Sequence, residues 1–505
     1  MIIQCQHVCL SSKNIKTLNP LTLQTLKHLR LSIILCLGIS LLAMQSVMAA
    51  SPKNKEPYKG YRFTLFIYGC QDSIMYLGNY YAGGTYAFDT ARISPKGMFV
   101  FENKERVLKP GLYFFTNPAG NYVEFAVYNN EKLNIHFDTE EPGWQNNMHI
   151  KGSKENELLF KFHQSNRAIY KVIDSVQASG ADSATFAEFR KKQILRMDSI
   201  KIAFINENPN SMLALLMNAT REPSVPAEDE KGNKLSTRER WEYYMDHYFD
   251  YTRLDDDAMI RTPELVFHKR LTDYLDVCLK NAPAETIIEY VDKLIDKARP
   301  SKENFRYLVH TIAEKYLQSN VMSYDAIYVH MVKKYIATGE CDWMSPTTVD
   351  NNVKRAETWE RLLLGKPAPP LIMRDDKGQV QSLYNLNHKY TLLIFWSPTC
   401  GHCKTAIPEL YKRYAKYRDK CDIAAYAVLS EPDEPTRPKW HEFIKTHHLD
   451  WINIDGGEAN IDWHEVYDVE TTPQIYLLDK DKKILAKKLS ADTFEEVLKA
   501  IEKIE

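Results

Sequence analysis

The sequence predicts a multidomain fold with an N-terminal antiparallel β-sandwich, an all-α middle and a C-terminal α/β domain. Three observations predict it. Short β-branched and aromatic segments fill residues 60–152, helical apolar spacing fills 153–362, and strands alternate with helices over 363–505. A chain of 505 residues agrees with two to four domains at roughly 150 residues each. The net charge of −1 argues against bulk electrostatic binding to nucleic acid or a membrane surface.

Residues 1–50 are predicted to be a signal peptide. The apolar run Leu31–Ala43 follows the basic residues Lys27 and Arg30, and small residues allow cleavage near Ala49 or Ala50. The alternative is an uncleaved membrane anchor, but the run of about thirteen residues is shorter than the roughly twenty that span a bilayer. We therefore expect a protein secreted across the inner membrane, periplasmic or envelope-associated, with a polar linker at 51–59.

The segment 60–152 contains short strand-like runs separated by turn signals such as Ser94–Gly97 and Asn129–Asn130. This spacing is typical of a small antiparallel sandwich. Its tyrosines could line a binding surface, although packing on strand faces is the simpler interpretation. The predicted strands are 63–67, 98–101, 112–115, 122–127 and 133–137.

Helical spacing dominates 153–362. Ser236 and Glu239 have capping-box spacing, Thr262 precedes a proline as a cap would, and Ser301 opens another helix. Polar residues at 222–235 predict an exposed loop. The histidines here lie on predicted helices and show no ligand spacing. The predicted helices are 154–178, 184–206, 236–254, 263–280, 283–298, 302–319 and 323–338.

The chemistry is predicted to lie in the C-terminal domain, which opens at the proline-rich boundary 364–370. The apolar run Tyr390–Trp396 predicts a buried strand, and 404–418 predicts a helix. Cys400 and Cys403 lie between them, where the partial positive charge of a helix amino terminus favours a thiolate. Half of a zinc site and an inert structural disulfide are the alternatives. No second Cys-x-x-Cys or His pair occurs at zinc spacing, so we expect redox chemistry and no metal.

Further predicted elements follow in this domain. A turn at 375–378 precedes a short strand near Ser382, and a buried strand is predicted at 423–429. Helices are predicted at 438–448 and near 460–468, and a hairpin at 475–486. The last helix is predicted to be capped by 492–495.

The run Phe-Trp-Ser-Pro-Thr-Cys-Gly-His-Cys-Lys at 395–404 resembles the active-site segment of thioredoxin-like proteins, especially the bacterial envelope type related to TlpA and ResA. Thr471–Asp479 resembles the family's Thr-Pro-strand segment, in which the proline is cis. The resemblance covers about 365–505. The β and helical regions resemble modules of unknown function that precede such domains in envelope proteins.

The resemblance implies a thiol–disulfide oxidoreductase. Cys400 would attack, or be attacked, and Cys403 would resolve the mixed disulfide. A charged His402 would stabilise the Cys400 thiolate, Pro473 would face Cys400 and help dock the substrate sulfur, and Trp396 would pack against the site. The expected partners are protein thiols or disulfides and an envelope electron donor or acceptor, without nucleic acid or a small-molecule cofactor.

Two positions depart from the family pattern. Thioredoxins proper have a buried Asp where Ile394 stands, and some envelope relatives have Glu where Ala406 stands. Such a carboxylate can accept the proton of the resolving cysteine. Glu409 is near in sequence but one turn further on. The rate and preferred direction of exchange therefore stay open.

Two other functions stay open at this point. A thiol peroxidase would need a proline seven residues and a Thr three residues before the attacking cysteine, and Leu393 and Ser397 occupy these positions. An envelope binding or scaffold protein would use its β and helical regions, with a secondary redox domain. The remaining cysteines, Cys70, Cys278, Cys341 and Cys421, could pair in an oxidising compartment or be buried free thiols.

Overall fold

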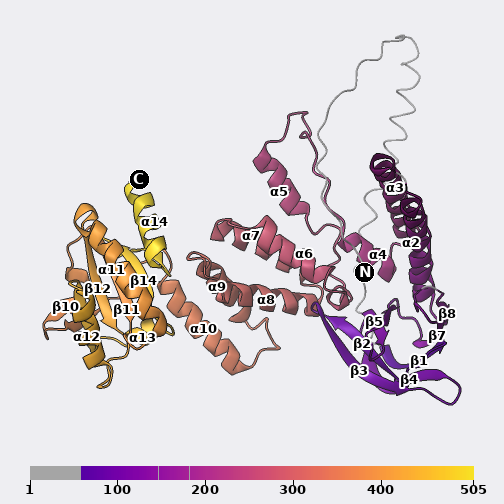
Figure 1. The fold of residues 1–505 in the computed structure, drawn as a ribbon, viewed down its shortest axis with the longest axis horizontal. Coiled ribbons are helices and arrows are strands. Elements are labelled where there is room, and N and C mark those ends of the chain that lie inside the picture. Colours follow the sequence, from indigo (N-terminus) through magenta and orange to yellow (C-terminus); the bar gives the residue numbers. More distant parts are fainter. Residues whose placement is uncertain (1–57, 146, 181, 505) are drawn as a thin grey trace, which may run out of the picture. The chain divides into compact units, whose positions relative to one another are not determined.

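The computed structural model describes residues 58–145, 147–180 and 182–504 (Figure 1). The predicted signal peptide and most of the predicted linker lie outside the described residues. The first strand begins at Tyr58, so the predicted linker overlaps its first two residues. No helix in the described part of the chain is both long enough and apolar enough to span a bilayer.

The N-terminal region is a sandwich of two four-stranded sheets, ordered β4-β1-β7-β8 and β3-β2-β5-β6. Aromatic side chains from both sheets, including Phe63, Phe115 and Phe125, form one buried core between them. The strands are β1 (Tyr58–Tyr68), β2 (Ile74–Tyr81), β3 (Gly84–Arg92), β4 (Met98–Leu108), β5 (Gly111–Thr116), β6 (Tyr122–Val127), β7 (Asn134–Glu140) and β8 (His149–Lys151).

One strand pair differs from the predicted antiparallel arrangement, because β1 and β7 run parallel, from Arg62 opposite Asn134 to Tyr68 opposite Glu140. Strands of the other sheet lie between them in sequence, so β7 enters beside β1 after a crossover. Alternating apolar residues mark the inner face of a strand, but they do not define the direction of its partner.

The helical region contains the predicted helices, with two additions. Helices α2, α3, α7 and α8 agree with the predicted ranges to within two residues, and the capping box of Ser236 with Glu239 and the cap at Ser301 are confirmed. The helices are α2 (Lys154–Ala178), α3 (Ser183–Glu207), α4 (Met212–Ala219), α5 (Thr237–His247), α6 (Phe267–Asp273), α7 (Ala284–Ala298), α8 (Lys302–Leu317), α9 (Asp325–Met331) and α10 (Pro346–Arg361).

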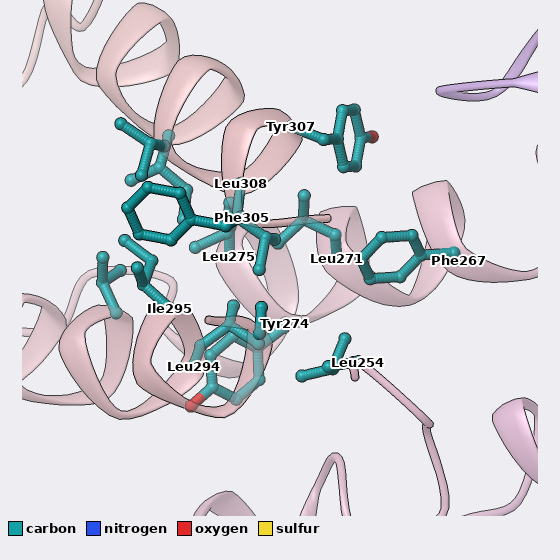
Figure 2. Close-up of a cluster of buried hydrophobic side chains, with 14 of the residues drawn as sticks. Leu254, Phe267, Leu271, Tyr274, Leu275, Leu294, Ile295, Phe305, Tyr307 and Leu308 are labelled. Atoms are coloured by element: carbon teal, nitrogen blue, oxygen red, sulfur yellow. The ribbon is translucent and has the colours of Figure 1, made fainter. Parts of the chain in front are cut away.

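Three details of the helical prediction were wrong. α6 begins at Phe267 rather than after a Thr262 cap, and α5 ends at His247. No separate helices were predicted at the positions of α4 and α10. Leu271, Tyr274, Leu294 and Leu308 meet in the apolar core of this region (Figure 2).

The C-terminal domain has a seven-stranded mixed sheet ordered β10-β9-β13-β12-β11-β14-β15. The inner strand β11 pairs parallel with β12 and antiparallel with β14. The strands are β9 (Ile372–Asp375), β10 (Val380–Ser382), β11 (Tyr390–Trp396), β12 (Ile423–Leu429), β13 (Ile452–Ala459), β14 (Gln474–Asp479) and β15 (Ile484–Lys487). The helices are α11 (Gly401–Cys421), α12 (Arg437–His447), α13 (Trp463–Val466) and α14 (Ala491–Glu502).

Both faces of this sheet are covered. Leu392, Ile394 and Trp396 of β11 join a cluster with α11 and α14, whereas Leu393 and Phe395 join a second cluster with Trp463 of α13. Burial on both faces explains the unbroken apolar runs of β11 and β12. β13 was not predicted, and Ser490, rather than 492–495, caps α14.

Candidate active site

The cysteine pair lies at the carboxyl end of β11 and the start of α11. All seven residues of β11 are buried, and the strand ends at Trp396. Cys400 is the N-cap residue of α11, with an extended backbone at φ −68° and ψ 125°. Its sulfur is therefore at the positive end of a helix of 21 residues, the position that favours a thiolate.

Cys400 is half-buried and close to the segment that precedes Pro473. Its Sγ donates a hydrogen bond to the carbonyl oxygen of Thr472 at 3.3 Å. Burial acts to raise the pKa of the Cys400 thiol. The Thr472 side chain, Cys403 and the backbone of His402 act in the opposite direction, and the net result is a lowered pKa.

Cys403 has the opposite environment. Its side chain is fully buried in the cluster formed with β11 and α11, and burial raises the pKa of its thiol to about 11. The two thiols therefore differ in reactivity. Cys400 is the better nucleophile at neutral pH, whereas Cys403 stays protonated there.

Pro473 lies between Thr472 and β14, and the Thr472–Pro473 peptide bond is cis. Because the Thr472 carbonyl accepts the hydrogen bond of Cys400, the segment that leads into Pro473 lies against the nucleophile. The structure thus brings together Cys400, Cys403 and Pro473 from segments about seventy residues apart.

Trp396 and His402 differ in burial. Trp396 is completely buried and packs on Phe443 of α12, with ring centroids 5.1 Å apart. His402 is exposed, and within the described part of the chain its imidazole makes no hydrogen bond. Its backbone acts to lower the pKa of Cys400, and the role of its charge stays a prediction.

The positions that depart from the family pattern hold no acid near the pair. Ile394 is fully buried in the apolar cluster that contains Cys403. Glu409 is exposed and pairs with Lys412 at 2.6 Å. The sheet interior behind the cysteines is apolar, so the proton of Cys403 has no carboxylate acceptor at either family position.

Sequence reasoning missed a carboxylate at the edge of the site. Glu431 Oε2 accepts hydrogen bonds from Ser397 Oγ at 2.7 Å and from Thr399 Oγ1 at 2.6 Å. Ser397, considered above as a replacement for a peroxidase Thr, is buried and engaged in this contact. A signal existed: Glu431 follows a buried strand that was predicted correctly, and the carboxyl ends of neighbouring parallel strands meet at one edge of a sheet.

The other cysteines stand apart from the pair. All six cysteines in the described residues are free thiols. In that same part of the chain, one group has metal-ligand proximity, formed by Cys70, Asp72 and Glu141 within 4.8 Å of one another. Asp72 already accepts a hydrogen bond from Asn117 at 2.7 Å, and Glu141 accepts one from Trp144. These carboxylates therefore have protein partners.

Comparisons with known proteins place relatives along the C-terminal domain. A model of the AhpC/TSA family matches residues 364–487. The thiol–disulfide oxidoreductase ResA of Bacillus cereus is 28% identical over 146 residues, which cover 29% of this chain and 80% of ResA. The C-terminal domain belongs to the thioredoxin-like thiol–disulfide oxidoreductases.

Solved structures include relatives of the thioredoxin-like domain. A domain of a possible thiol–disulfide isomerase from Cytophaga hutchinsonii is 37% identical and covers 28% of this chain and 94% of that chain, with a TM-score of 0.26. The thioredoxin domain of a thiol–disulfide oxidoreductase from Bacteroides vulgatus is 30% identical and covers 28% and 96%, with a TM-score of 0.24. Upstream of the thioredoxin-like domain, residues 184–357 match a domain of unknown function, DUF5106.

Proposed function

We propose that this chain exchanges disulfides with protein substrates in the bacterial cell envelope through a reversible Cys400–Cys403 pair. The observation that carries the proposal is that the two thiols differ in exposure and in pKa. Cys400 is half-exposed with a lowered pKa, and Cys403 is buried with a pKa raised to about 11. An accessible thiolate beside a protected thiol is the arrangement that two-step exchange needs.

In the reducing direction, the Cys400 thiolate attacks one sulfur of a substrate disulfide. A Cys400–substrate disulfide forms, and the other substrate sulfur leaves as a thiolate. Cys403 then loses its proton and attacks the Cys400 sulfur, which releases the second substrate thiolate. Two electrons pass from the dithiol to the substrate, and the two protons of the dithiol end on the released thiols. Oxidation of a substrate dithiol is the reverse sequence.

The other residues of the site would assist the cysteine pair without forming bonds to the substrate sulfur. Pro473 borders Cys400 and would guide the incoming substrate sulfur. Trp396 would support the back of the site through its contact with Phe443. His402 would favour the thiolate when its ring is charged. An envelope thiol protein would supply or accept the electrons, and the leader predicted at 1–50 would direct the chain across the inner membrane.

The reduction potential of the pair tests the proposal. Purified protein would be equilibrated in glutathione buffers, and its thiols would be trapped and counted, with Cys400→Ser as the control. A value near about −270 mV indicates a reductase, and one near about −180 to −120 mV indicates an oxidase or isomerase. A pair that never cycles between dithiol and disulfide would overturn the proposal.

A further inference from the structure

Glu431 joins two strands at the edge of the active site. The register of the parallel pair β11–β12 places Trp396 opposite Leu429, and the backbone N–H of Ser430 donates to the Trp396 carbonyl at 2.9 Å. Ser397 directly follows β11, Glu431 lies two positions beyond the end of β12, and their side chains meet. One carboxylate oxygen then accepts hydrogen bonds from both Ser397 and Thr399.

The two hydroxyl oxygens also lie close together because both donate their single proton to the same carboxylate oxygen. Ser397 Oγ and Thr399 Oγ1 are 2.7 Å apart, and the Thr399 N–H donates to Ser397 Oγ at 3.2 Å. The Cys400 N–H donates to the Ser397 carbonyl at 3.3 Å. Residues 397–400 thus form one hydrogen-bonded turn that ends at the nucleophile. Glu431 anchors its first part, through Ser397 and Thr399, and the Thr472 carbonyl contacts its last residue, Cys400.

This turn determines where Cys400 stands relative to α11. The backbone N–H groups of His402 and Cys403, at the positive end of that helix, act to lower its pKa. This electrostatic effect falls off beyond the first turn of a helix, so a shifted N-cap residue would lose part of it. The geometry of 397–400 is therefore a condition for thiolate stabilisation.

We propose that Glu431 is a positioning residue for the Cys400 nucleophile, which it holds at the start of α11 through Ser397 and Thr399. The proposal deepens the proposed function and rests on it. Glu431 acts at a distance through hydrogen bonds and does not transfer a proton or touch the reacting sulfur. The carboxylate, which follows the neighbouring strand β12, thus fixes the position of Cys400 indirectly.

The hydrogen bonds and the charge of Glu431 have opposite effects on Cys400. The hydrogen bonds orient the turn and favour the thiolate, whereas a nearby negative charge disfavours it. Glu431→Gln separates the two, because the amide oxygen can still accept from both hydroxyls while the charge is lost. Thr399→Val tests the acceptor from the other side with little change in volume.

The experiment measures alkylation of Cys400 by iodoacetamide in the full chain, resolved by peptide mass spectrometry and followed against pH. We expect Glu431→Ala and Thr399→Val each to slow alkylation at pH 7 about three- to tenfold. The double variant should be no slower than Glu431→Ala, since residues in one hydrogen-bond network are not additive. Glu431→Gln should stay within about twofold of the unmodified chain.

Glu434→Ala is the matched control, because this acid lies in the same loop with a side chain 93% exposed. Thermal melting would show whether each variant is folded, and Glu431→Gln and Thr399→Val carry the test if Glu431→Ala is not. An unchanged profile for Glu431→Ala, additive effects in the double variant, or slowing in Glu431→Gln as large as that in Glu431→Ala would overturn the proposal. Alkylation needs no disulfide exchange, so a chain that fails to cycle overturns the proposed function alone.

Discussion

The sulfur of Cys400 lies 3.3 Å from the carbonyl oxygen of Thr472, although 72 positions separate the two residues in the sequence. The contact joins the start of α11 to the segment that leads into β14. The docking proposed for Pro473 would therefore bring a substrate sulfur to the same side of Cys400 as this contact.

Thr472→Val should weaken the Cys400 nucleophile. The substitution removes the side-chain hydrogen bond that lowers the pKa of Cys400, but it keeps the backbone carbonyl and the β-branched shape. The thiolate fraction at pH 7 then falls, and we expect alkylation of Cys400 to slow about three- to tenfold. Thr471→Val, at the exposed neighbouring position, is the control and should match the unmodified chain. Equal slowing in both variants would contradict the role of the hydroxyl.

Cys403→Ser should trap a substrate. Without the resolving thiol, the disulfide between Cys400 and a substrate cannot be released from within the chain. Incubation with oxidised glutathione should give a stable adduct on Cys400, detected by intact-mass spectrometry and reversed by dithiothreitol. Cys400→Ser should give no such adduct on Cys403, because that side chain is buried. An adduct on Cys403 in the second variant would show that the two roles have been assigned the wrong way round.

The two thiols should react with iodoacetamide over different pH ranges. A lowered pKa means that the Cys400 thiolate forms at lower pH, so its alkylation should rise before that of a cysteine in the unfolded chain. Cys403, with its pKa raised to about 11, should stay unreactive through neutral pH. The two profiles should converge in denaturant, where burial and helix position are lost. Matching profiles in the folded chain would remove the basis for the assigned roles.

Ile394→Ala should destabilise the thioredoxin-like domain without touching the cysteines. Ile394 is fully buried in the cluster around β11, so the change leaves a cavity and should cost about 2–5 kcal/mol. Ile372→Ala, at a residue 44% exposed on β9, is the control and should change stability by at most about 0.5 kcal/mol. Chemical denaturation followed by tryptophan fluorescence measures both, and similar costs would mean that Ile394 is less tightly packed than described.

The parts of the thioredoxin-like domain that could be predicted were those with a single strong signal. β11 and β12 were predicted to the residue, because burial on both faces gives an unbroken apolar run. β13 was missed, because Gly456 and Gly457 interrupt its apolar pattern and give it little strand signal of its own. Pairing with β12 and β9 forms this strand, and such pairing cannot be read from a local window.

The candidate site shows the same division. Cys400 and Cys403 lie in one short recognisable segment, and Pro473 lies in another. Glu431 has no local sequence pattern of its own, because its position beside Ser397 depends on the register between two strands. The N-terminal sheets add a similar case: the inner faces of β1 and β7 could be predicted, but their parallel direction could not.

The register of β11 and β12 also determines which residue after β12 meets Ser397 and Thr399. Successive residues of a strand point to opposite faces, so a shift of one position exchanges every side chain between the two faces. A single residue inserted at Asp422, in the turn between α11 and β12, would offer Ser430 or a misdirected Glu431 to the hydroxyls of Ser397 and Thr399. A length change 22 positions after Cys400 would therefore impair the nucleophile while both cysteines remain intact. The spacing between α11 and β12 should tolerate substitution far better than insertion or deletion.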